Sequence, residues 1–356
     1  MPPLLKFLIH RLLFAAVSLI LITFVLYAGS NIMPLEARAA LYMSNSKREL
    51  TEEQRQRLID VIIQSHRLED PLVVQYVSWL GTLASGTWGY SPVLHANVLP
   101  SLLRRTPVTL EIALFSLLLM VPLGFSSGLI SGWQPYRRFD KFFRSLAYVA
   151  TSTPPFILSI VMLSVFYVSL GWFFPGRLYT ATSIEISRET FIQYTGMLTL
   201  DSLLNGRLDI FLSYLRHLTM PIFTLSLYHW ATLGRVTRVT VIAEKSKAYL
   251  MAARARGVSS RKLLWHHAAR AILAPSLTTI GLAAANIVTG IFVVEIIFDL
   301  NGVSEVIVLA MMDISDAAAT MGFAIYSVVM VLGLMVGIDL LQAFLDPRVR
   351  EEVMKA

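Results

Sequence analysis

Six apolar runs, each long enough to cross a bilayer, constrain the fold of this chain more than any other feature. They cover roughly residues 9–29, 108–131, 146–170, 217–236, 277–298 and 319–344. A transmembrane helix needs about 20 mostly apolar residues. Only 15% of the residues are charged, whereas soluble domains carry about a quarter. The sequence therefore predicts an all-α membrane protein with six transmembrane helices.

Within the first run, the uninterrupted apolar part from Leu12 to Ala28 follows Lys6, His10 and Arg11, as the apolar core of a signal peptide would. It is longer than such a core, and no small-residue cleavage site follows it. We therefore interpret it as a retained span. Pro122 interrupts the second run and Pro154-Pro155 open the third, which is tolerable where neighbouring helices or water satisfy the freed carbonyls.

Lysine and arginine residues near the ends of the runs indicate the orientation, because basic loops stay on the cytoplasmic side. With the N-terminus inside, that side holds Lys6 and Arg11, the group at 137–144, the cluster at 235–270 and the group at 348–355. The loop after the fifth run is acidic and lies outside. Both termini are therefore expected in the cytoplasm. The net charge of +7 reflects these loops, and we expect no nucleic-acid partner.

The chain is thus expected to divide at the ends of the runs. Residues 1–29 form a short tail and the first span, 30–107 an extended external segment, 108–345 the core, and 346–356 a cytoplasmic tail. Within the external segment, Thr51 and Gln54 fit a capping box that opens a short amphipathic helix. Residues 71–88 are apolar but short, and their tryptophans favour an interfacial helix over a seventh span.

The stretch from 244 to 275 reads EKSKAYLMAARARGVSSRKLLWHHAARAILAP. Its alanine-rich first half predicts a helix that ends at Gly257. Ser259 suits the N-cap of a second short helix from about Ser260, and Pro275 suits the first turn of the next span. The pattern indicates two short helices joined by a sharp turn on the cytoplasmic side.

Small residues at this turn, Ala252 and Ala253, let another backbone approach closely. Arg254 and Arg256 supply charge around such a contact. A basic loop attracted to anionic lipid headgroups explains the same residues equally well. The residue chemistry alone leaves docking of a separate protein and binding to the membrane surface both open.

As a whole the stretch resembles the EAA loop of ABC importer permeases, in particular the first-permease branch of the dipeptide/oligopeptide/nickel family. In that family a tyrosine precedes an A-R-A-K-G segment, with Leu-Pro at fixed spacing afterwards. The matching residues here are Tyr249, Ala253-Arg254-Ala255-Arg256-Gly257 and Pro275. The resemblance implies a coupling loop that docks on an ATPase, and its docking residues would be Tyr249, Ala252, Ala253, Arg254, Ala255, Arg256, Gly257, Val258, Ser259 and Ser260.

Further matches extend the resemblance over nearly the whole chain. They are Asp70-Pro71-Leu72, Gln75-Tyr76, Trp79-Leu80, the run from Gly86 to Ser91, the run from Thr106 to Glu111, Val294-Glu295 with Phe298 and Gly302, and Asp346-Pro347-Arg348. Three positions depart from the family pattern: Met251 replaces an acidic residue, Leu300-Asn301-Gly302-Val303-Ser304 replaces W-P-G-L-G, and Met33-Pro34-Leu35-Glu36 replaces G-D-P. These departures weaken any transfer of substrate preference.

The resemblance implies a type I importer permease in a prokaryotic inner membrane. Its partners would be a second homologous permease, two ABC ATPases, an extracytoplasmic substrate-binding protein and membrane lipid. No G-x-x-x-x-G-K-S/T motif occurs in the chain. The resemblance therefore places ATP and Mg on the partner ATPases, and no cofactor in this chain. Peptides are the expected substrate, with nickel or another small solute of the same family as the alternative.

Polar residues inside the runs are candidates for lining the pathway. They are Thr109, Glu111, Asn286 and Glu295. For Glu111 a charge at a helix end is the simpler explanation, and for Asn286 helix packing. No catalytic arrangement and no metal-ligand cluster is evident, so we expect no enzyme activity. A secondary transporter or a membrane scaffold remain the other classes, but the chain lacks the matching broken spans that a secondary transporter needs.

Overall fold

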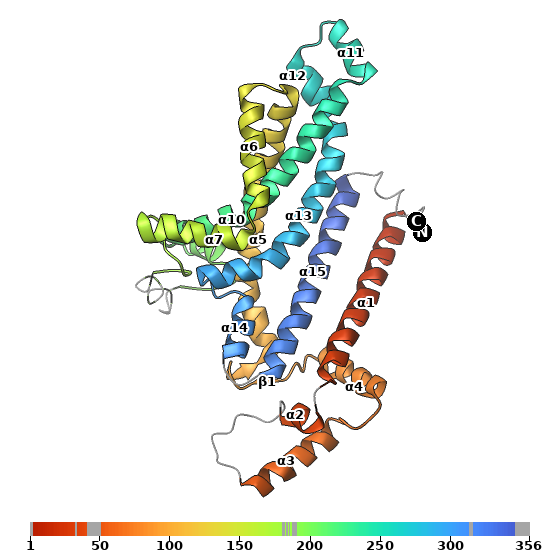
Figure 1. The fold of residues 1–356 in the computed structure, drawn as a ribbon, viewed down its shortest axis with the longest axis vertical. Coiled ribbons are helices and arrows are strands. Elements are labelled where there is room, and N and C mark those ends of the chain that lie inside the picture. Colours follow the sequence, from red (N-terminus) through yellow and green to blue (C-terminus); the bar gives the residue numbers. More distant parts are fainter. Residues whose placement is uncertain are drawn as a thin grey trace. The chain divides into compact units, whose positions relative to one another are not determined.

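A computed structural model describes residues 3–32, 34–40, 51–179, 182, 184, 186, 191–312 and 316–345, and it is almost entirely helical (Figure 1). Within these residues five helices are long and apolar enough to cross a membrane: Lys6–Ser30, Val98–Trp133, Leu208–Lys245, Ala271–Phe298 and Ala317–Leu340. A bent pair of helices makes a sixth if it is counted as one span. The predicted all-α membrane fold is confirmed.

The chain divides into two compact units, residues 1–7, 108–301 and 334–356 in the first and 8–107 and 302–333 in the second. The long helices α1 (Pro3–Ser30), α5 (Val98–Trp133) and α15 (Ala317–Leu345) contribute residues to both. The first unit also holds α6 (Arg138–Ser152), α7 (Pro155–Met162), the π-helix η1 (Leu163–Ser169), α9 (Leu198–Leu204), α10 (Leu208–Lys245), α11 (Ala248–Ala255), α12 (Ser260–Lys262), the π-helix η2 (Leu263–Ala268) and α13 (Ala269–Phe298).

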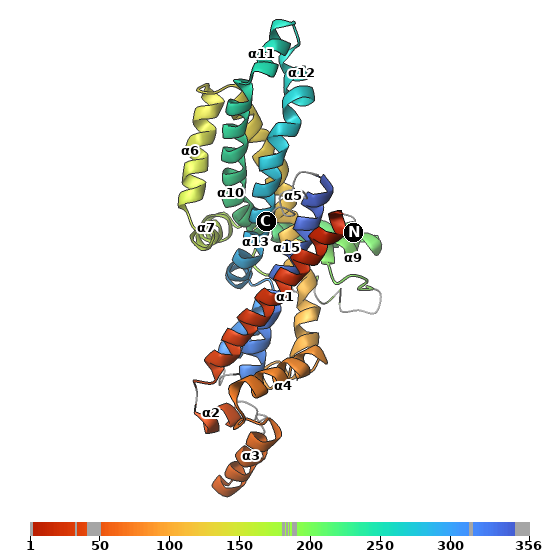
Figure 2. The same ribbon diagram turned by 90° about the vertical axis from the view of Figure 1, so that its right-hand side faces the viewer.

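Helix α10 is the centre of the first unit. It packs against α13 along much of its length and against α6 on another side, and α6 and α10 lie side by side in Figure 2. Tyr214 and Leu218 on α10 pack with Ile112 of α5 and with Ile287 and Ile291 of α13 in one buried cluster. The helices that carry the polar candidates therefore share one core.

Close packing between α5 and α10 depends on glycine. Gly124, Gly128 and Gly132 recur every fourth residue on α5, so they lie on one face. A Cβ atom at Gly128 would lie 2.4 Å from the carbonyl oxygen of Gly234 on α10. Small residues at such spacing let two membrane helices approach until their backbones touch. This glycine contact was not predicted from the sequence.

The predicted third span, residues 146–170, is not one continuous helix. Helix α6 ends at Ser152, α7 begins at Pro155, and the two are bent by 101°. A residue before proline is pushed out of the helical region, and two prolines in succession impose this on both Thr153 and Pro154, which have ψ angles of 112° and 145°. The proline pair therefore breaks the span.

Three other expectations about boundaries are corrected. Helix α5 begins at Val98, so the last residues of the predicted external segment are already helical, and Pro122 does not interrupt it. Helix α10 covers 208–245 where 217–236 was predicted, with Pro221 inside it. The polar ends of both helices continue the backbone hydrogen bonding beyond the apolar run, which hydropathy alone does not detect.

The second unit also contains α2 (Leu35–Ala40), α3 (Glu52–Ser65), α4 (Leu72–Ala84), α14 (Ser304–Met312) and a two-stranded antiparallel sheet, β1 (Tyr90–Ser91) with β2 (Ala96–Asn97). The predicted capping box is present, since the Thr51 N–H donates to Gln54 Oε1 at 3.2 Å. Asp316 joins distant parts of this unit, because it accepts from the Ser91 hydroxyl at 2.5 Å and from the Ala319 N–H at 2.9 Å.

Candidate functional site

The turn predicted at Gly257 is present and defines the turn segment, residues 248–262. Helix α11 ends at Ala255, and Gly257 has φ +83°, a left-handed conformation that glycine adopts without strain. The Gly257 N–H donates to the Arg254 carbonyl at 2.9 Å, and the Val258 N–H to the Ala253 carbonyl at 3.2 Å. These bonds satisfy the last carbonyls of α11 and reverse the chain. Figure 1 places α11 and α12 at one end of α10 and α13.

The second helix of the pair begins where it was predicted, after Ser259, but it is not a separate short helix. The elements α12, η2 and α13 follow one another without a break from Ser260 to Phe298. Pro275 lies inside α13 rather than in its first turn. The turn segment is therefore joined directly to the span that follows it, and a displacement of the turn acts on α13 with no flexible linker between them.

One face of the turn segment is buried. Leu250 and Ala253 pack with Leu129 of α5, Val241 of α10 and Leu263 of η2 in one apolar cluster, which Ala268 and Ile272 complete. Ala253 is 1% exposed. The expectation that Ala252 and Ala253 both lie open to a partner is therefore wrong for Ala253, whose small side chain lets α11 lie close to this chain's own helices. Ala252 is exposed.

The opposite face of the turn segment is open and basic. Its exposed predicted residues are Tyr249, Ala252, Arg254, Ala255, Arg256, Gly257, Ser259 and Ser260, and Val258 is half-buried. No ion pair to Arg254 or Arg256 occurs among the residues that the structure describes. Two arginine side chains and the turn at the end of α11 are thus exposed together.

Side chains just before the turn segment hold it in place. Glu244, at the end of α10, is buried and accepts from the Tyr249 hydroxyl at 2.5 Å, and its other oxygen lies 2.8 Å from Lys247 Nζ. Desolvation, followed by the bond to Glu244 and its negative charge, raises the pKa of Tyr249 to about 12. Lys245 donates to the Trp133 carbonyl at 2.6 Å and lies 5.1 Å from the centre of its ring.

A buried ion pair connects α6 to α10. Asp140 is completely buried and pairs with Arg238, whose Nε lies 2.5 Å from Oδ1. The Tyr136 N–H donates to Asp140 Oδ2 at 2.8 Å, and the Ser131 hydroxyl also donates to this carboxylate. The carboxylate thus joins the end of α5, the loop after it, α6 and α10. Asp140 and Arg238 are 98 residues apart in the chain, so no local sequence pattern predicts this pair.

Three of the four pathway candidates are enclosed in the core of the first unit. Glu111 is completely buried and accepts from the Thr199 N–H at 2.8 Å, from the Tyr214 hydroxyl at 2.7 Å and from the Thr199 hydroxyl. Thr109 donates to Glu295 Oε1 at 2.5 Å, and both are buried. In this conformation these residues join helices and do not line an open surface.

Asn286 differs from the other candidates because its side chain is exposed on α13. Thr278, Leu282, Thr289 and Val293 are also exposed and follow the same helical spacing. Mid-span polar groups are not left facing lipid, because hydrocarbon offers no hydrogen-bond partner. This stripe is therefore suited to another protein surface or to water.

Residues 98–351 match the model of the binding-protein-dependent transport system inner membrane component family. The chain belongs to this family. The matched region contains the turn segment and the whole of α5, α10 and α13, on which the turn segment packs. The predicted assignment to the ABC importer permeases is confirmed, and such a subunit works with an ATPase and a substrate-binding protein.

Similar proteins occur in several bacteria. The chain is 30% identical over 297 residues to a probable D,D-dipeptide transport system permease protein of Escherichia coli, covering 82% of this chain and 86% of that protein. It is 29% identical over 290 residues to a di/tripeptide transport system permease protein of Pseudomonas aeruginosa, covering 81% and 84%. It is 29% identical over 288 residues to an oligopeptide transport system permease protein of Bacillus subtilis, covering 81% and 83%.

Proposed function

We propose that this chain is a permease subunit of an ATP-driven peptide importer and forms half of its translocation pathway. The names of its relatives, which are permeases for dipeptides, tripeptides and oligopeptides, support the peptide substrate. A second homologous permease supplies the other half of the pathway. Two ATPase subunits bind ATP and Mg, and an extracytoplasmic binding protein delivers the peptide.

The turn segment is the ATPase-docking element. One observation carries this proposal. The exposed face of the turn segment carries basic residues and small side chains, while its buried face packs on α5, α10 and η2 at once. A force applied to the exposed face of the turn segment is thus transmitted to α5, α10 and the continuous helix of η2 and α13, because the side chains between them are already close-packed. A loop that only touched lipid headgroups would not need this buried attachment.

The mechanism that follows is alternating access by rigid bodies. ATP binding closes the ATPase pair and displaces the turn segment. The unbroken path from Ser260 into α13 carries that displacement into the span that bears Asn286 and Thr289. This exposed polar stripe faces the pathway or the second permease. The cavity then changes the side of the membrane to which it opens.

Coupling is tested in the assembled importer in proteoliposomes, by the ATPase activity that substrate-loaded binding protein stimulates. We expect Gly257→Pro, which cannot adopt φ +83°, and Ala253→Glu, which buries a charge in the apolar cluster, to abolish this stimulation. Arg254→Glu with Arg256→Glu changes only exposed side chains and is expected to weaken it. Arg57→Glu, an exposed change on α3, is the matched control. Normal stimulation in all the turn variants would reject the docking assignment.

The proposed orientation places both termini and the turn segment in the cytoplasm and α3 outside. The chain has no cysteine, so single cysteines report topology directly. In intact cells a membrane-impermeant maleimide should label Gln56→Cys and leave Ser260→Cys unlabelled until the membrane is opened. The reverse pattern would overturn the orientation.

A further inference from the structure

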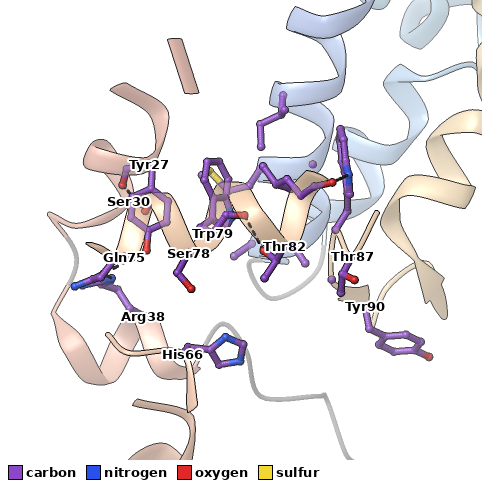
Figure 3. A pocket seen from close by; sticks show the side chains of 18 of the residues that line it. Tyr27, Ser30, Arg38, His66, Gln75, Ser78, Trp79, Thr82, Thr87 and Tyr90 are labelled. Atoms are coloured by element: carbon purple, nitrogen blue, oxygen red, sulfur yellow. Dashed lines mark hydrogen bonds between the residues drawn. The ribbon is translucent and has the colours of Figure 1, made fainter. Parts of the chain in front are cut away.

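An open cavity of about 410 Å³ lies within the second unit. Its walls come from the end of α1, from α2, from the segment at 65–92 and from the start of α15. The volume is in the range of about 300–1,000 Å³ that is typical of small-molecule sites. Figure 3 shows Arg38 and Gln75 at one side of this space, with Ser78 and His66 facing it.

Arg38 is the main charged group of the cavity. It is 9% exposed, and its Nη2 donates to Gln75 Oε1 at 2.6 Å. Gln75 cannot turn away, because its amide nitrogen donates to the Leu68 and Asp70 carbonyls at 2.9 and 2.6 Å. The guanidinium is therefore fixed in position, and among the described residues only one of its five N–H groups has a hydrogen-bond acceptor.

Within the described lining of the cavity, no carboxylate balances this charge. Among the described residues that line the cavity, none is Asp or Glu, and Arg38 takes part in none of the ion pairs found in the described parts of the chain. Burial lowers the pKa of His66, which disfavours a second positive charge in the cavity. A buried cation is ordinarily paired, and here the open side of the cavity is where its partner would lie.

The remaining residues that line the cavity suit a ligand with an apolar surface. Trp79 is held against Tyr27 with ring centres 4.9 Å apart, and Trp88 is fixed by a bond from its indole N–H to the Leu83 carbonyl at 3.1 Å. The Ser78 hydroxyl is exposed to the cavity and makes no hydrogen bond within the described residues. Rigid aromatic walls with a few polar groups are typical of pockets that orient a ligand.

We propose that this cavity binds a small oxyanion, a carboxylate or phosphate, through Arg38, with Ser78 as a second donor and the tryptophans against the apolar part of the ligand. The C-terminal carboxylate of a short peptide is the source we favour, and that choice rests on the proposed function. A lipid phosphate is the other source of the same chemistry.

Binding is tested on the full chain purified in maltoside detergent, which contains no phosphate, by following tryptophan fluorescence. The probes are the dipeptide Ala-Leu, its C-terminal amide, and phosphatidylglycerol. We expect saturable binding of Ala-Leu, none of the amide, and weakening of about tenfold or more in Arg38→Gln, because an ionic hydrogen bond is lost. Arg57→Gln, an exposed arginine on α3, is the matched control and should bind normally.

Ser78→Asp keeps the test valid if Arg38→Gln fails to fold. It places a carboxylate at an exposed helical position in the cavity and should abolish binding by repulsion, whereas the neutral Ser78→Asn should not. Binding of phosphatidylglycerol alone, lost in the same variants, would support the oxyanion site and name lipid as the source. The proposal would be overturned if neither Ala-Leu nor phosphatidylglycerol binds. Equal ligand affinity in Arg38→Gln and Arg57→Gln would also overturn it. Neither result depends on ATPase coupling, so the permease function is judged separately.

Discussion

Arg238 on α10 holds Asp140 on α6 with two donors, Nε to Oδ1 at 2.5 Å and Nη2 to Oδ2 at 2.9 Å. Asp140 has no exposed surface, and the side chain of Arg238 is 14% exposed. The pair connects the helix before the bend to the helix that ends at the turn segment. It therefore fixes the position of α6 against α10.

Breaking this pair on one side should destabilise the protein strongly. We expect Asp140→Asn to lower the free energy of unfolding by about 3–5 kcal/mol, because Arg238 is left as an uncompensated buried charge. Unfolding of the purified chain in detergent measures the effect. The double variant Asp140→Leu/Arg238→Met removes both charges and should be more stable than Asp140→Asn. A double variant that is no more stable than Asp140→Asn would contradict this explanation.

The glycine contact between α5 and α10 should not tolerate a methyl group. In Gly128→Ala the new Cβ would lie 2.4 Å from the Gly234 carbonyl oxygen and 2.7 Å from Cβ of Thr237. We expect a loss of about 1–3 kcal/mol, since the helices must separate. Gly337→Ala is the control, because no atom lies within 4 Å of its added Cβ. It should be neutral or gain up to about 1 kcal/mol. Equal melting temperatures of the two variants would refute the contact.

Tyr249 should remain protonated well above the usual range for tyrosine. Its pKa is raised to about 12 in the folded protein, against 10.0 for the unperturbed group. The stabilisation by its bond to Glu244 is therefore fully present below pH 10 and is lost as the pH rises through 12. Phenolate absorbance, recorded as the difference between wild type and Tyr249→Phe, should show one tyrosine titrating near 12. A difference that titrates near 10 would exclude the bond.

Glu111 is expected to act as a structural group rather than a substrate contact. Glu111→Ala leaves the Thr199 N–H and the Tyr214 hydroxyl without their acceptor, which should cost about 1–3 kcal/mol for each group. Glu111→Gln keeps the shape and one acceptor oxygen, and we expect it to restore part of the stability and of the transport rate. Asp209→Asn, an exposed change at the start of α10, serves as the control. Stable Glu111→Gln protein that no longer transports peptide would assign Glu111 to the pathway instead.

Much of the candidate site was predictable because it depends on local rules. The turn at Gly257 follows from the conformation that ends a helix, and the start of the next helix after Ser259 follows from capping preference. Proline alone could not show how much the third span bends. A single proline inside a membrane helix is tolerated, as Pro122 and Pro221 are, whereas Pro154-Pro155 force two extended residues in succession.

By itself the sequence determined the membrane-spanning runs, the family and the position of the turn, because each depends on residues that are close in the chain. Only the tertiary structure decided which side of the turn faces inward. Ala252 and Ala253 are neighbours of the same type, yet one is exposed and the other is buried against α5 and α10. The same holds for Asp140 with Arg238 and for Glu111 with Thr199. Buried charges are stabilised only by partners that the packing of helices brings within about 3 Å, and no local pattern specifies that packing.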